Sequence, residues 1–189
     1  RHVLGSRGLG DVYKRQIPIR EGDRKEALRR YEFIQKFLKE SRQFGSQRRE
    51  SEKKAVATAL ENLAMTAGFS DVNRMTWYLE SEKLAELTPF FDGVELEGIL
   101  LRLEINEEGT AALAMEKKGK PLKTLPKALS KNETALAIKE TVKELKEQKR
   151  RARESLERAM TESTLFWADE LEIILNNPVL APMAAGLIW

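Results

Sequence analysis

Apolar side chains recur every three to four positions along much of the chain, which is the spacing of one face of an α-helix. This spacing predicts a first helix over residues 24–42, opened by the capping aspartate Asp23. We expect Gly45 to close it in the left-handed conformation that glycine adopts at helix ends. The same spacing predicts a second helix over residues 48–67, closed in the same way by Gly68.

Two more helices follow from the same pattern. One begins after Asp71 and ends before Pro89, because the residue that precedes a proline avoids the helical region. A short one near the end of the chain stops before Pro178. It carries three spaced apolar residues: Leu171, Ile174 and Leu175.

The pattern changes to strict alternation in the middle of the chain, which is typical of a half-buried strand. The alternating residues are Ile99, Leu101, Leu103 and Ile105. A turn at 106–109, a second strand through Met115, a turn at 117–120 and a third stretch over 121–125 complete the pattern. It predicts a three-stranded antiparallel meander over about residues 94–125.

The longest predicted helix runs over about residues 131–160, opened by a capping box of Ser130 and Glu133. Its apolar positions form a heptad seam that is interrupted once, by Lys149. We expect this seam to pack against the rest of the domain rather than form a dimeric coiled coil. The fold class is therefore α+β, mainly α, with about five helices and the small meander.

The first sixteen residues lack a helical or strand period, and residues 8–16 resemble a translated sequencing adaptor. We therefore interpret residues 1–16 as a non-native, disordered leader and residues 17–189 as a single helical domain fragment with the meander inserted, truncated at its apolar C-terminus. The whole chain has a net charge of +3, which the leader supplies in full. Without it, basic and acidic side chains balance, so the charge gives no argument for an anionic partner.

Catalytic chemistry has few candidates in this composition. The chain has no cysteine, and its one histidine, His2, lies in the leader. Nucleophilic catalysis needs a Ser, Thr or Cys beside a general base, and that base is most often a histidine. We therefore expect no catalytic, cofactor-binding or metal-binding residues. Whether the parent protein is an enzyme stays open, because other parts of a longer protein could complete a site.

Two groups of residues are candidates for binding. The run of Lys149, Arg150, Arg151 and Arg153 could contact phosphates or a protein partner, or it could be a solvated helix face neutralised by nearby glutamates. The aromatic pairs could line a ligand site, or they could pack in the core or against another domain. These pairs are Trp77 with Tyr78, and Phe166 with Trp167.

Several short sequence words point to a family. They are Phe37–Gly45, Glu61–Ala64, Gly119–Pro126, Gln148–Arg153 and Asn177–Pro182. Together they resemble the large bacterial proteins of domain-of-unknown-function family 4132, which are often labelled molybdate-metabolism-regulator-like and sometimes carry a WGR module. The resemblance covers about residues 25–189. No Trp-Gly-Arg triplet occurs in this chain, so a DNA-binding role does not carry over through that module.

The resemblance implies a bacterial cytoplasmic part of a longer polypeptide and supplies no activity. We therefore expect a non-catalytic structural and interaction segment without a cofactor, whose partners are the remaining domains of the parent polypeptide. The alternative is a nucleic-acid-associated module that uses the basic stretch of the long helix. No apolar run reaches the length of a membrane span, so we expect no membrane partner.

Overall fold

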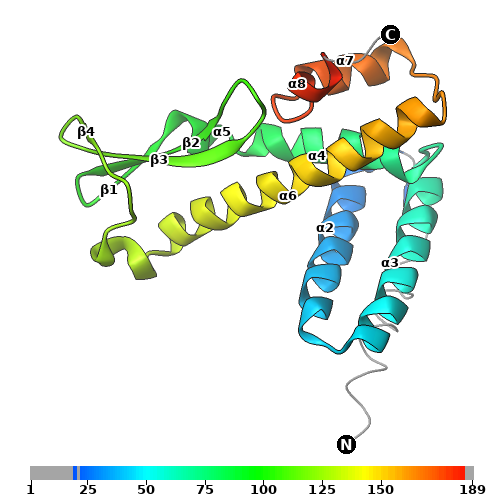
Figure 1. Cartoon of the computed structure of the whole chain (residues 1–189), viewed down its shortest axis with the longest axis horizontal. Helices are drawn as coiled ribbons and strands as arrows, with labels where there is room; N and C mark the ends of the chain where they lie inside the picture. Colours follow the sequence, from blue (N-terminus) through cyan, green and yellow to red (C-terminus); the bar gives the residue numbers. More distant parts are fainter. Residues whose placement is uncertain (1–18, 21, 186–189) are drawn as a thin grey trace, which may run out of the picture. The chain divides into compact units, whose positions relative to one another are not determined.

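The computed structural model describes residues 19–20 and 22–185. Over these residues it contains seven α-helices, two 3-10 helices and a four-stranded antiparallel sheet (Figure 1). The chain divides into two compact units, of which one ends at Leu79 and the other begins at Glu80. The expected class, α+β and mainly α, is confirmed, although both the helices and the strands outnumber the prediction.

The first unit is built from two long helices and the beginning of a third. They are α2 (Arg24–Glu40), α3 (Ser46–Thr66) and α4 (Val72–Glu86), and α4 continues into the second unit. Helices α2 and α3 pack side by side (Figure 1). Their apolar faces and the first turns of α4 share a core that includes Ala27, Tyr31, Val56, Leu63 and Met75.

The ends of these helices test the predicted caps. The Asp23 side chain accepts a hydrogen bond from the Glu26 amide at 3.0 Å, as an N-cap does. Gly68 has a φ of +79°, so the glycine that closes α3 takes the expected left-handed conformation. The prediction for Gly45 is wrong, because its φ is −62° and it forms the N-cap of α3. Instead α2 tightens into a 3-10 turn, η1 (Ser41–Gln43), before the chain becomes extended at Phe44.

The second unit contains the sheet, which has one more strand than predicted. Its strands are β1 (Val94–Leu96), β2 (Ile99–Ile105), β3 (Ala111–Lys117) and β4 (Lys120–Pro121), hydrogen-bonded in that order. Strand β1 is too short to show an alternating pattern in the sequence. The third predicted stretch is mostly outside the sheet, because only Lys120 and Pro121 pair with β3.

Helices precede and follow the sheet along the chain. Helix α4 ends at Glu86, before Pro89 as predicted, but Thr88, the residue before the proline, is itself helical. It begins a short helix, α5 (Thr88–Asp92), that has Pro89 in its first turn and packs against β2. The 3-10 helix η2 (Lys127–Lys131) precedes α6 (Glu133–Thr161). The core of the unit forms between the sheet and the first half of α6, and it includes Leu101, Leu103, Leu129, Ile138 and Val142.

The predicted capping box of α6 is wrong at its first residue. Asn132 caps the helix instead, accepting a hydrogen bond from the Ala135 amide at 3.0 Å. The Ser130 hydroxyl donates to the Lys127 carbonyl at 2.7 Å, because residues 127–131 form the preceding 3-10 helix. The heptad seam is buried within the single chain at all its apolar positions. These are Ile138, Val142, Leu145, Ala152, Leu156 and Ala159.

Two short helices follow α6 in the second unit. The predicted helix before Pro178 is present as α7 (Ala168–Asn176), and α8 (Ala181–Ala184) was not predicted. Helix α8 packs against both α6 and α7 (Figure 1). The part of the apolar C-terminus that lies within residues 177–185 is therefore folded, and Val179 and Leu180 are buried.

Candidate functional site

The four residues of the basic stretch point in different directions from α6. The Lys149 ammonium donates a hydrogen bond to the Thr110 hydroxyl at 2.6 Å, at the turn between β2 and β3. The Arg151 guanidinium forms an ion pair at 2.6 Å with Glu80, whose side chain is 5% exposed. Two of the four cations therefore have partners inside the second unit.

The other two lie on the exposed side of α6. Arg153 pairs with Glu157, one turn further along, at 2.9 Å. Both of these side chains are largely exposed, so the pair contributes little to stability. Arg150 is exposed as well. The structure thus distributes the stretch over several contacts and does not gather its four charges on one exposed face.

The first aromatic pair belongs to the first unit. Trp77 is buried, and Tyr78 lies with its ring centroid 5.5 Å from that of Phe69. The Arg24 guanidinium lies over both of the latter rings, 4.4 Å from the Phe69 centroid and 5.1 Å from the Tyr78 centroid. It also donates to the Ala67 carbonyl at 2.7 Å, so it ties the end of α3 to the start of α2.

The second aromatic pair lies between α6 and α7. Phe166 is half-buried, whereas Trp167 is 74% exposed. The Trp167 amide donates to the Glu170 carboxylate at 3.0 Å, which fixes the entry of the chain into α7. The tryptophan is therefore held at a defined place in the fold although most of its side chain meets solvent.

Trp167 belongs to a segment rich in exposed apolar side chains that sequence reasoning did not identify. Among the described residues, four of the six exposed large apolar side chains lie between residues 160 and 175. We call this the α7 surface: Met160 (52% exposed), Leu165 (86%), Trp167 (74%) and Leu175 (46%). Such a concentration differs from the singly scattered apolar residues that are normal on protein surfaces.

The segment that carries the α7 surface is acidic along the chain, although Arg158 precedes it in the last turn of α6. Residues 159–189 contain four carboxylates and no lysine or arginine. The carboxylates are Glu162, Asp169, Glu170 and Glu172. This imbalance was readable from the sequence, but the exposure of the apolar residues beside it was not.

A buried asparagine supports this end of the unit. The Asn177 amide nitrogen donates to the Ser81 hydroxyl on α4 at 2.8 Å. Its oxygen accepts from the Val179 amide at 2.9 Å, which forms the turn between α7 and α8. Asn177 is 2% exposed, so its side chain makes a partly buried polar contact between the end of α7 and α4.

A clear pKa shift is found at the cap of α4. Burial alone raises the pKa of Asp71, but hydrogen bonds from the Arg74 amide and side chain, together with the guanidinium charge, lower it further than burial raises it. The net result is a pKa below the ordinary value of 3.8. This shift belongs to a helix cap and its ion pair, and thus has a structural cause.

The side chains and helices of the described residues also bear on metal binding and membrane spanning. Within them, His, Cys, Asp and Glu side chains form no group of three that could hold a metal ion. None of the helices described is both long and apolar enough to cross a membrane.

Comparison with known families matches most of the first unit and the later part of the second. A small helical unit and a helical unit with a sheet define an α+β protein, mainly α. Residues 16–79 match a family of unknown function, DUF5724, and residues 119–189 match a domain of unknown function, DUF4132. The expected resemblance to family 4132 is therefore supported over the second segment, and the first matches a different family. No curated protein and no solved structure matches the chain.

Proposed function

We propose that this chain is a non-catalytic structural and interaction segment of a larger bacterial cytoplasmic protein. In this proposal the α7 surface binds another part of the same polypeptide. The observation that carries it is the exposure of Leu165 and Trp167, at 86% and 74%, within a segment of sixteen residues that has four exposed large apolar side chains. Burial of one large apolar side chain contributes about 1.5–3 kcal/mol, so a partner that covers several of them gains affinity from each.

The composition of the surface defines the chemistry of its partner. Tryptophan and its apolar neighbours are typical of the centre of an interface, and charged residues are typical of its rim. Here the segment that carries the surface is acidic along the chain, apart from Arg158 just before it. The matching partner is therefore an apolar segment flanked by lysine or arginine side chains, whose charges lie against Glu162, Asp169 and Glu172.

The experiment compares the labelling of exposed side chains in two states of the chain. Hydroxyl-radical footprinting is performed on this chain alone and on the longer polypeptide encoded by the intact gene. We expect labelling of Met160, Leu165 and Trp167 to fall in the longer polypeptide. Equal labelling of these three residues in both states would show that no other part of the polypeptide covers the α7 surface, and the proposal would be wrong.

A pair of matched variants separates a specific interface from general protection. Leu165→Ser removes an anchor of the α7 surface, whereas Leu136→Ser changes an exposed leucine, 43% exposed, near the start of α6. In the longer polypeptide we expect Leu165→Ser to restore labelling of Trp167 and Leu136→Ser to leave it low. If both variants restore labelling equally, the protection does not come from contacts at this surface.

A further inference from the structure

A second surface of the same unit has the opposite charge. Residues 117–132 contain six lysines and no aspartate or glutamate. We call them the lysine cluster: Lys117, Lys118, Lys120, Lys123, Lys127 and Lys131. All six are exposed, and across residues 19–20 and 22–185 none of them has an ion-pair partner. This distinguishes them from Lys149 and Arg151, which have partners inside the fold.

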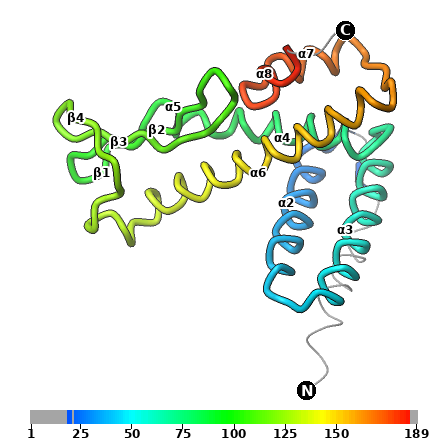
Figure 2. Tube along the Cα trace, in the orientation of Figure 1, coloured from blue at the N-terminus to red at the C-terminus, as the bar shows by residue number. Residues whose placement is uncertain are grey.

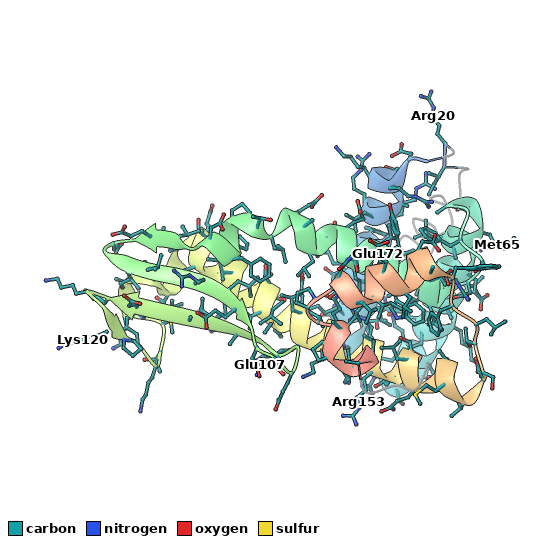
Figure 3. All side chains as sticks on the ribbon, turned by 90° about the horizontal axis from the view of Figure 1, so that it is seen from above. Arg20, Met65, Glu107, Lys120, Arg153 and Glu172 are labelled. Atoms are coloured by element: carbon teal, nitrogen blue, oxygen red, sulfur yellow. The ribbon has the colours of Figure 1, made fainter. Side chains whose placement is uncertain are left out.

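Most members of the lysine cluster lie on the β3–β4 hairpin and on η2. Three of its members lie on the hairpin of β3 and β4, and the last two lie on η2, directly before α6 (Figure 2). Lys120 projects outward at the far end of the sheet, away from the turn that contains Glu107 (Figure 3). The apolar side chains between the lysines point inward, because Leu129 is buried and Leu122 and Leu125 pack against the core.

Two lysines of the hairpin are paired across neighbouring strands, which is unfavourable for like charges. Lys117 and Lys120 are directly paired across β3 and β4. Like charges in this position destabilise a strand pair. Between them, Lys118 has a φ of +50°, in the left-handed region that favours glycine, asparagine or aspartate.

The turn geometry does not require these lysines. The turn between β1 and β2 has the same backbone form, with φ values of +52° at Glu97 and +71° at Gly98. There the flanking pair is Leu96 with Ile99, which is apolar. The repulsion in the β3–β4 hairpin therefore comes from the choice of side chains and lowers the local stability of the strand pair. Local losses of stability of this kind are expected at functional sites.

We propose that the lysine cluster binds the phosphate backbone of double-stranded nucleic acid without reading its sequence. An array of unpaired cations spread over a turn, a loop and a short helix fits a ligand that repeats its negative charges. The region lacks Phe, Tyr and Trp, which a single-strand binder uses to stack bases. Its leucines face the core, so it lacks the exposed apolar anchor of a membrane-surface segment.

The test measures binding of the whole chain to a short, mixed-sequence DNA duplex by fluorescence anisotropy between about 50 and 200 mM salt. Each phosphate contact contributes about −0.9 to the slope of log affinity against log salt. Replacing Lys118, Lys120 and Lys123 by glutamine should therefore make this slope shallower by up to about 2.7. A change in the duplex sequence should leave the affinity unchanged.

The matched control removes the same charge from α6. The variant Arg150→Gln, Arg153→Gln and Arg158→Gln also loses three positive charges, and all three arginines are exposed. We expect it to retain most of the wild-type slope. If this variant loses as much as the lysine variant, binding follows net charge and the proposal is overturned. No binding to the duplex at low salt also overturns it, as does equal binding to poly-glutamate or to phosphatidylserine vesicles.

One further variant separates binding from a structural role of the hairpin. Lys120→Glu places an opposite charge across from Lys117, so the strand pair should become more stable. We expect the urea midpoint to rise while the affinity for the duplex falls. A fall in both quantities would show that Lys120 serves the fold, which would contradict the proposal.

Discussion

Gly109 lies where the turn between β2 and β3 meets the backbone after α7. Its φ is +73°, and a Cβ atom built on it would lie 2.7 Å from the Val179 carbonyl oxygen. The Pro178 carbonyl oxygen would be 3.2 Å from the same atom. Because both neighbours are backbone atoms, they have less freedom to move than the end of a flexible side chain. Gly109→Ala should therefore force the hairpin tip and the 178–179 segment apart.

The magnitude follows from two separate costs. A residue other than glycine in the left-handed region costs about 1–2 kcal/mol. Forcing an extra methyl group into a close contact costs about 1–3 kcal/mol more. We therefore expect Gly109→Ala to lower the free energy of unfolding by about 2–5 kcal/mol.

Gly119 provides a matched control in the same sheet. Its φ is +75°, but no atom lies within 4 Å of the position of a Cβ. Gly119→Ala should show only the conformational cost, so the difference between the two variants isolates the close approach at Gly109. Urea unfolding followed by circular dichroism measures the total effect. Hydrogen exchange at the Val179 and Leu180 amides shows whether the loss lies at the contact.

The reasoning would be refuted if the two alanine variants lose the same stability. Equal losses would mean that the 178–179 backbone moves away from the hairpin tip without cost. Unchanged exchange at Val179 in Gly109→Ala, together with a large loss of stability, would place the strain elsewhere and refute it as well.

Two other predictions concern charged groups that the fold uses. Because the pKa of Asp71 is lower in the folded protein, its contribution to stability is present above the unfolded value of about 3.9 and is lost as the pH falls through the folded value. Asp71→Ala should cost about 1 kcal/mol near neutral pH and flatten the acid side of a thermal-unfolding profile, whereas an equally steep acid side would contradict the shift. Arg151→Met removes the ion pair that the Arg151 guanidinium forms with the buried Glu80 carboxylate, and it should lower the free energy of unfolding by about 3–5 kcal/mol in urea unfolding. The double variant with Glu80→Gln should recover part of this loss, and full additivity of the two changes would show that the pair is not coupled.

The helices were predictable because their signals are local. Spaced apolar residues and the capping aspartates Asp23 and Asp71 act within one or two turns, and both caps are present in the structure. The errors occurred where two interpretations compete locally. Gly45 could end one helix or begin the next, and its φ of −62° shows that it begins α3. Ser130 was predicted to cap α6, but Asn132, two residues later, is the cap.

The sheet and the candidate site depend on contacts that the sequence pattern does not contain. Strand β1 has three residues, and only pairing with β2 makes it a strand. The partners of Lys149 and Arg151 lie 39 and 71 positions away along the chain, so a run of basic letters could not show which charges stay in solvent. The sequence shows that residues 117–132 contain six lysines, but only the fold shows that these lysines form no ion pairs with the other described residues.

Helix α6 connects the lysine cluster to the α7 surface as a rigid spacer. Its 29 residues extend over about 43 Å at 1.5 Å per residue. The cluster ends at Lys131, just before the helix, and the surface begins at Met160, in its last turn. Ligands bound at the two ends would therefore be held apart at a fixed distance and would not compete for space. Because each inserted residue turns a helix by about 100°, the length of α6 also sets the direction in which one ligand faces the other.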